Sequence, residues 1–197
     1  MKAKSPRVIL ASGSARRKEI LEKAGLKFEV VPSDYEEDMT LPLPPAELVK
    51  TLAFGKANDV ASRFPDAVVI GADTVVVLEG KVMGKPHTSV AAQKMLSLLS
   101  GTTHEIVTGV AVVCKGSGFV AKDAVSIKIT FKDLTEEAIK NYVQTGEPLD
   151  KAGAYAVQGV GMELIEKVDG DYWGAVGISL AILARHLKVF GLSVELL

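Results

Sequence analysis

The chain contains almost no cysteine. Cys114 is the only cysteine in 197 residues, which excludes an internal disulfide and indicates a reducing compartment. This residue ends the apolar run from Val110 to Val113, so a buried core side chain is favoured over a nucleophile. The protein is therefore expected to fold without covalent cross-links and to lie in the cytoplasm.

The chain also lacks an excess of charge and a long apolar stretch. Its formal net charge is −1, so it has no general basic field with which to hold nucleic acid or an anionic membrane. The basic residues Lys2, Lys4 and Arg7 are followed by an apolar stretch of residues 8–11 only, too short for a signal segment or a membrane span. Any anion-binding site must therefore be built locally, and we expect no nucleic acid or membrane partner.

What the chain does contain is enough apolar sequence for a full core. With 48% hydrophobic residues over 197 positions, one domain covering residues 1–197 is the simplest organisation. Hydrophobic periodicity and turn residues predict strands near residues 8–11, 28–31, 67–78, 104–114, 119–131 and 162–168. They predict helices near residues 14–24, 46–63, 88–101, 135–144 and 178–189. Because strands and helices alternate but hairpins are frequent, the predicted fold class is α/β with a mixed, twisted sheet.

One carboxylate stands in the most apolar stretch of the chain. Asp73 lies within residues 67–78, a run rich in β-branched residues that predicts a buried strand. An ionised carboxylate is rarely buried unless it is paired with a cation or holds a metal ion. The alternative is a bend in which Gly71 and Asp73 end one strand and leave the carboxylate in solvent. Asp73 is therefore the first candidate for a functional residue.

A second candidate site lies where the first strand meets the first helix. Residues 12–18 have the sequence Ser-Gly-Ser-Ala-Arg-Arg-Lys. The unpaired N–H groups of a helix N-terminus, with Arg16 and Arg17 beside them, are groups that bind phosphate oxygens. The spacing matches neither a Walker A loop nor the GxGxxG fingerprint. A surface helix with a basic start is the alternative, and this pattern alone does not decide between the two.

Two lysines and an acidic cluster add charged candidates. Lys56 falls on the apolar stripe of the 46–63 helix, where a lysine either extends its ammonium group to the edge or points into a cleft. Lys85 stands before a proline in a loop, and most such loop lysines are solvated. Most acidic clusters are solvated too, but residues 36–38 together with Asp73 offer the oxygen ligands that Mg²⁺ prefers.

A glycine-rich polar segment, residues 145–159, has the composition of a binding loop. Within it Gln158 can donate and accept hydrogen bonds, which suits recognition of a nucleotide base. A turn-rich connector is the alternative. The three histidines lack metal-ligand spacing, and the serines near residue 12 have no histidine close by in sequence. Neither a histidine metal site nor a serine nucleophile is therefore expected.

Taken in order, these motifs resemble the Maf family of nucleoside triphosphate pyrophosphatases. The matching blocks are Leu-Ala-Ser-Gly-Ser-Ala-Arg-Arg-Lys-Glu-Ile-Leu at 10–21, Ile-Gly-Ala-Asp-Thr-Val-Val at 70–76, Gly-Lys-Pro at 84–86, Leu-Ser-Gly-Thr-Thr-His at 99–104, Gly-Glu-Pro-Leu-Asp-Lys-Ala-Gly-Ala-Tyr at 146–155 and Gln-Gly at 158–159. They run in family order over nearly the whole chain. One departure is Ala15, where the family usually has proline at the first helical position; the change removes no chemical group.

The resemblance implies an elongated α/β fold shared with the inosine triphosphatase-like enzymes, in which two lobes surround a cleft. It implies that Asp73 activates the attacking water and that Glu37 is a polar residue of the cleft. Our hypothesis is that Glu37 and Asp73 bind the metal ion. Glu36 is left as the alternative to Glu37, because this loop aligns poorly. The substrate-binding positions that it implies are Arg16, Thr74 and Gln158 for specificity, and Ser12, Arg17, Lys56 and Lys85 in the lining of the cleft.

The activity that the resemblance implies is Mg²⁺-dependent cleavage of a nucleoside triphosphate between the α and β phosphates, with Mn²⁺ or Co²⁺ as substitutes. The 146–155 block and Gln158 resemble the subfamily that acts on dTTP and UTP. Maf proteins are also linked to arrest of septum formation, so a nucleotide-binding regulator of cell division with little or no turnover is the alternative. A phosphatase that releases orthophosphate is another. Whether the chain pairs into a homodimer is left open.

Overall fold

The computed structural model describes residues 6–197, so Lys2 and Lys4 of the basic start lie outside the described residues. Its centre is one mixed sheet with the strand order β2-β1-β3-β5-β6-β7, and β4 pairs with β3. Strand β1 runs parallel to β2 and β3, whereas the β3–β4 and β6–β7 pairs are antiparallel. The strands are β1 Val8–Leu10, β2 Glu29–Val30, β3 Val68–Leu78, β4 Lys81–Met83, β5 Thr103–Cys114, β6 Phe119–Phe131 and β7 Ile165–Asp169. The α/β class and the mixed sheet predicted from the sequence are confirmed.

Six α-helices accompany the sheet in the described part of the chain. They are α1 Ala15–Lys23, α2 Pro45–Arg63, α3 Ser89–Leu99, α4 Glu136–Gln144, α5 Tyr172–Val176 and α6 Leu180–Leu187. The hydroxyl groups of Ser14, Thr88 and Thr135 cap α1, α3 and α4 by accepting a backbone N–H of the first turn. These helices therefore start where polar residues in the sequence indicated.

The chain divides into two compact units. The first contains Met1–Asp73, Thr108–Val125 and Gly177–Leu197, and the second contains Thr74–Val107 and Ser126–Val176. Strands β3, β5 and β6 contribute residues to both units. Each unit is described by itself below, and a single domain with two lobes stays a prediction.

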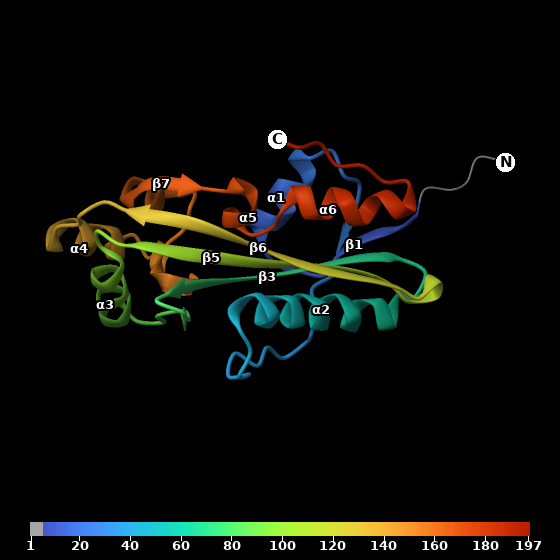
Figure 1. The fold of residues 1–197 in the computed structure, drawn as a ribbon, viewed down its shortest axis with the longest axis horizontal. Helices are drawn as coiled ribbons and strands as arrows, with labels where there is room; N and C mark the ends of the chain where they lie inside the picture. Colours follow the sequence, from blue (N-terminus) through green and yellow to red (C-terminus); the bar gives the residue numbers. More distant parts are fainter. Residues whose placement is uncertain (1–5) are drawn as a thin grey trace. The chain divides into compact units, whose positions relative to one another are not determined.

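The core of the first unit lies between α2 and the strands β1, β3 and β5. Figure 1 shows α2 along one face of these strands, with α1 and α6 on the opposite side. Small residues allow this close approach: a Cβ atom on Gly71 of β3 would lie 2.2 Å from the Ala53 carbonyl oxygen of α2. A Cβ atom on Gly109 of β5 would lie 2.4 Å from the Val49 carbonyl oxygen. The core residues of this layer are Ile9, Ala11, Ala53, Ala57, Val60, Ala61, Ala67, Val69, Ala111 and Val113.

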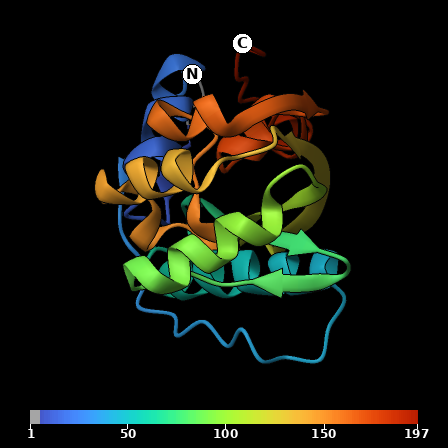
Figure 2. The same cartoon turned by 90° about the vertical axis from the view of Figure 1, so that its left-hand side faces the viewer.

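The second unit packs around a buried aromatic cluster. The rings of His104, Phe131 and Tyr155 meet edge to face, with centroids 4.7 to 5.4 Å apart. The Tyr155 hydroxyl lies 2.6 Å from His104 Nε2. Burial lowers the pKa of His104 to about 4, so the ring is neutral near pH 7. Helices α3 and α4 of this unit lie side by side (Figure 2).

Several boundaries differ from the sequence predictions. Strand β3 continues through Gly71 and Asp73, so the interpretation of this stretch as a bend is wrong. Strand β7 begins at Ile165 instead of near Met162, because residues 159–164 form a 3-10 helix. Helix α5 was not predicted: its five residues are too few for a periodic pattern. Among the described residues, no helix combines the length and apolar character needed to cross a membrane.

Candidate active site

The packing of α2 against β3 determines the direction of the Asp73 side chain. Alternate residues of a strand face the same side of a sheet, so Val69, Gly71 and Asp73 share one face. Val69 belongs to the core beneath α2, and Gly71 touches Ala53 of that helix. Asp73 therefore projects on the α2 side of β3, where it is 5% exposed.

Lys56 of α2 joins the two carboxylates of this site. Its Nζ atom donates a hydrogen bond of 2.6 Å to Asp73 Oδ1 and lies 2.9 Å from Glu37 Oε1. The Lys56 side chain is 12% exposed, so its ammonium group points into this cluster rather than to the edge of the helix. The sequence had left both orientations open. A buried carboxylate is here balanced by a buried cation.

The surroundings of Asp73 change its affinity for protons. Burial raises the pKa of Asp73 above its ordinary value. The positive charges of Lys56 and Arg17 act against this increase, whereas the Glu37 carboxylate adds to it. A carboxylate with a raised pKa is a better proton acceptor than an ordinary one.

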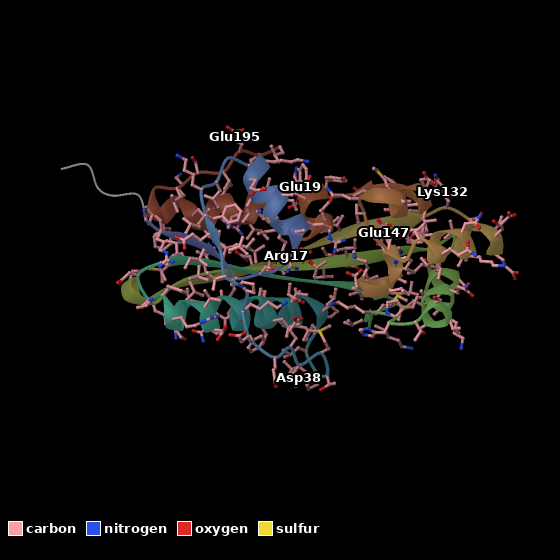
Figure 3. The ribbon with its side chains drawn as sticks, turned by 180° about the vertical axis from the view of Figure 1, so that it is seen from behind. Arg17, Glu19, Asp38, Lys132, Glu147 and Glu195 are labelled. Carbon is pink, nitrogen blue, oxygen red and sulfur yellow. The ribbon has the colours of Figure 1, made fainter. Side chains whose placement is uncertain are left out.

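The start of α1 brings a guanidinium group to the same cluster. Arg17 Nε donates to the Gly177 carbonyl oxygen at 2.9 Å, and its Nη1 donates to Ser12 Oγ at 3.2 Å. Protein atoms enclose this guanidinium group although part of the residue is exposed, and this burial lowers the pKa of Arg17. The negative charges of Asp73 and Glu37 act in the opposite direction. Figure 3 shows Arg17 in the first turn of α1.

Arg16 and Arg17, adjacent in sequence, are held differently. Arg16 is half-buried, and in residues 6–197 no hydrogen bond or ion pair fixes its side chain. Arg17 is held by two bonds to groups of the first unit. The structure thus separates a fixed arginine from a more adjustable one.

The loop before α2 distinguishes the three acidic neighbours. Glu37 reaches Lys56, whereas Asp38 accepts hydrogen bonds from the Thr40 backbone and hydroxyl group. Figure 3 shows Asp38 on the outer part of this loop, on the far side of α2 from Arg17. Glu36 is exposed, and within the described chain no hydrogen bond or ion pair holds its side chain. Of these candidates, the geometry therefore favours Glu37.

Three further candidate residues belong to the second unit. Thr74 follows Asp73 directly in β3, so its side chain leaves the strand on the opposite face. Lys85 is exposed in a loop that backbone hydrogen bonds hold on either side: Gly153 N–H donates to the Gly84 oxygen, and His87 N–H donates to the Leu149 oxygen. Gln158 is half-buried at the start of the 3-10 helix 159–164. The first unit thus gathers six of the nine candidates, Ser12, Arg16, Arg17, Glu37, Lys56 and Asp73.

The donor set is compatible with a hard divalent cation. Within the described residues, no group of three or more His, Cys, Asp or Glu side chains is arranged around a metal position. Glu37 and Asp73 nevertheless direct one carboxylate oxygen each at the same cationic atom, Lys56 Nζ. Mg²⁺ is commonly held by one or two carboxylates together with water and substrate phosphates. The two carboxylates therefore fit such an ion.

Sequence reasoning missed the residues that hold the loop before Glu37. Tyr35 packs its ring on Gly55 of α2, and Asp59 accepts hydrogen bonds from the chain at residues 33 and 34. One signal was present in the sequence: a glycine inside a helical pattern usually has a packing reason.

An α/β fold with arginine, lysine and carboxylate groups gathered at one site is typical of proteins that act on phosphate-containing anions. The family model described as "Maf-like protein" matches residues 7–190, and the chain belongs to this family. A curated protein of Moorella thermoacetica, named dTTP/UTP pyrophosphatase, is 47% identical over 188 residues. A Bacillus cereus protein with the same name is 45% identical. Both alignments cover 95% of this chain and 97% of the relative.

Proposed function

We propose that this protein hydrolyses nucleoside triphosphates, with dTTP and UTP preferred, to the nucleoside monophosphate and pyrophosphate. The proposal depends chiefly on one observation: the buried Asp73 carboxylate lies 2.6 Å from Lys56 within a cluster that also contains Arg17 and Glu37. Two curated relatives that align along nearly their whole length are named dTTP/UTP pyrophosphatase, which supports the choice of substrate.

In this proposal Asp73 accepts a proton from the attacking water. Lys56 bonds to Oδ1, which leaves Oδ2 of the same carboxylate to orient that water. The raised pKa of Asp73 favours proton acceptance, while Lys56 keeps the group ionised. The water then attacks the α phosphorus and pyrophosphate leaves.

The cationic side chains bind the triphosphate. Arg17 is held by Ser12 and the Gly177 carbonyl oxygen, which limits the movement of its guanidinium group. In this proposal that group binds phosphate oxygens. Lys56 and the loop lysine Lys85 are proposed to add further positive charge. Neutralising the triphosphate in this way lowers the barrier, because negative charge develops on the leaving pyrophosphate.

Glu37 and Asp73 are the residues that would hold Mg²⁺, with Mn²⁺ or Co²⁺ as substitutes. When bound, the ion would supply positive charge to the phosphate oxygens. Arg16, Thr74 and Gln158 are proposed to recognise the nucleoside. Gln158 can both donate to and accept from a pyrimidine base edge. Homodimer formation and a cytoplasmic location remain predictions.

The test is a panel of nucleoside triphosphates assayed with Mg²⁺, in which pyrophosphate and orthophosphate are measured separately. We expect one pyrophosphate per monophosphate, with dTTP and UTP ahead of purine substrates. Asp73→Asn should reduce kcat by about 10²- to 10⁴-fold while the protein stays folded, because it removes the proton acceptor but keeps the shape. Full activity of this variant would disprove the role of Asp73.

Other outcomes of the same assay identify the alternatives. Nucleotide affinity without any product would indicate a nucleotide-binding regulator of cell division instead of an enzyme. Release of orthophosphate would indicate a phosphatase. Equal rates on purine and pyrimidine substrates would disprove the preference for dTTP and UTP.

A further inference from the structure

We propose that Tyr35 and Asp59 are positioning residues: they hold the loop on α2 so that Glu37 lies beside Lys56. Gly55 provides the space for the Tyr35 ring. This inference rests on the proposed function, because it assigns these residues to a carboxylate of the proposed metal site. It concerns only residues of the first unit.

The segment before Glu37 is bonded to α2 step by step. Arg63 Nη2 donates to the Pro32 carbonyl oxygen at 3.2 Å. One turn earlier in the helix, Asp59 Oδ2 accepts the Ser33 hydroxyl at 3.0 Å and the Asp34 N–H at 3.1 Å. Arg63 also donates to the same Asp59 oxygen at 2.9 Å, which fixes that carboxylate. The chain therefore begins its path along α2 with a defined direction.

The next contact uses a glycine in the middle of the helix. Tyr35 N–H donates to Ser33 Oγ at 3.0 Å, which closes a tight turn. The Tyr35 ring then lies on Gly55, where an added Cβ atom would be 2.3 Å from Cζ of that ring. Glycine weakens a helix interior, so its presence here is explained by the space that the ring requires. Only a residue without a side chain accepts Tyr35 in this position.

These contacts follow the helix in order and end at the proposed site. Gly55, Asp59 and Arg63 are four residues apart and so lie on one stripe of α2. The loop contacts them in reverse order, and Glu37 then reaches Lys56, next to Gly55 in sequence, at 2.9 Å. The Glu37 side chain is 43% exposed, and exposed ion pairs contribute little by themselves. The contacts of residues 32–35 with α2 therefore bring the chain to the point from which Glu37 reaches Lys56.

The test compares Tyr35→Ala, Tyr35→Phe, Asp59→Asn and Glu37→Gln in the full chain. In Tyr35→Ala and Asp59→Asn we expect faster amide hydrogen exchange in residues 33–38 and a half-saturating Mg²⁺ concentration raised about tenfold, with kcat at saturating Mg²⁺ within about twofold. Tyr35→Phe keeps the ring that covers Gly55 and should behave as the wild type. Asp66→Asn, an exposed acidic residue beyond the end of α2, is the matched charge control.

A double-mutant cycle separates positioning from a general structural role. If Tyr35 acts through Glu37, adding Tyr35→Ala to Glu37→Gln should change the half-saturating Mg²⁺ concentration by less than about twofold. The proposal would be overturned if Tyr35→Ala raised the half-saturating Mg²⁺ concentration tenfold both in the wild type and in Glu37→Gln. It would also be overturned if Tyr35→Ala alone left this concentration unchanged. Thermal unfolding of each variant shows that the comparison is made between folded proteins.

The same variants distinguish this inference from the proposed function. If the wild-type chain releases no pyrophosphate, the proposed function fails, and the cycle is repeated on binding of Mn²⁺ alone, measured by electron paramagnetic resonance. Non-additive weakening of Mn²⁺ binding by Tyr35→Ala and Glu37→Gln would support the positioning role. Additive effects, or a wild-type chain that binds no Mn²⁺, would reject it.

Discussion

Gly71→Ala tests the close approach of α2 to β3, on which the direction of Asp73 and the reach of Lys56 depend. The added Cβ atom would lie 2.2 Å from the Ala53 carbonyl oxygen and 2.9 Å from the Ala57 nitrogen. Ordinary contact begins near 3.4 Å, so helix and strand must separate by about 1.2 Å at this point. Since both contacts are backbone atoms, no side-chain rotation relieves the clash.

The magnitude follows from this displacement. Overpacking a close-packed core costs about 1–3 kcal/mol in the free energy of unfolding. Lys56 lies between the two contacted residues of α2, so a shift of the helix also moves Nζ away from Asp73 Oδ1, now 2.6 Å distant. Misplacement of about 1 Å in a catalytic arrangement costs on the order of 10² in rate.

Urea unfolding and pyrophosphate release measure the two effects. The matched control is Gly84→Ala, because an added Cβ atom there meets nothing within 4 Å. This control should keep its activity and remain as stable as the wild type or gain about 0.4–1 kcal/mol. Wild-type stability and activity in Gly71→Ala would show that the helix contact does not determine the geometry of the site.

Three further predictions concern ionisation and charge. Lys56→Met removes the ammonium group that lowers the pKa of Asp73, so the acid limb of kcat/KM should move to higher pH; an unchanged limb in the pH profile would contradict this. Arg17→Lys cannot keep both bonds of the guanidinium group, and kcat/KM should fall about 10- to 100-fold in steady-state assays with little change in melting temperature. Because burial lowers the pKa of His104 from 6.5 to about 4, the wild type should lose about 2 kcal/mol of stability between about pH 7 and about pH 5. Urea unfolding of His104→Gln should lack this loss, and an equal loss in the variant would assign it to other groups.

Local sequence signals located most of the helices and strands. Helices α1, α3 and α4 begin close to the predicted starts at residues 14, 88 and 135, where the hydroxyl groups of Ser14, Thr88 and Thr135 cap them. A cap involves only the first turn of its helix, so a local pattern can indicate it. Glu79 and Gly80 form the turn between β3 and β4, both with positive φ. Helix α5 and the late start of β7 escaped prediction, because short elements follow their packing more than their own pattern.

The sequence predicted which residues belong to the candidate site but not how their side chains contact one another. The bend at Gly71 and Asp73 was a local alternative that only the strand pairing could exclude. The choice of Glu37 over Glu36 depends on a loop bonded to α2 through Asp59 and Tyr35, contacts of 20 or more residues in sequence separation. Local sequence patterns cannot predict contacts between residues so far apart in the chain.

The sequence by itself determined that Asp73 lies in the most apolar stretch of the chain, that cationic and acidic candidate residues precede and follow it, and that the chain resembles one family. Composition and short-range periodicity are enough for the first two conclusions, because they depend on residue types and on neighbouring residues. The resemblance rests on the ordered motif blocks. Only the tertiary structure decided which groups meet: Lys56 with Asp73 and Glu37, and Arg17 with a carbonyl oxygen 160 positions away. Those contacts depend on how closely α2 packs on β3 and on where the C-terminal segment returns within the first unit, and both depend on packing across the whole unit.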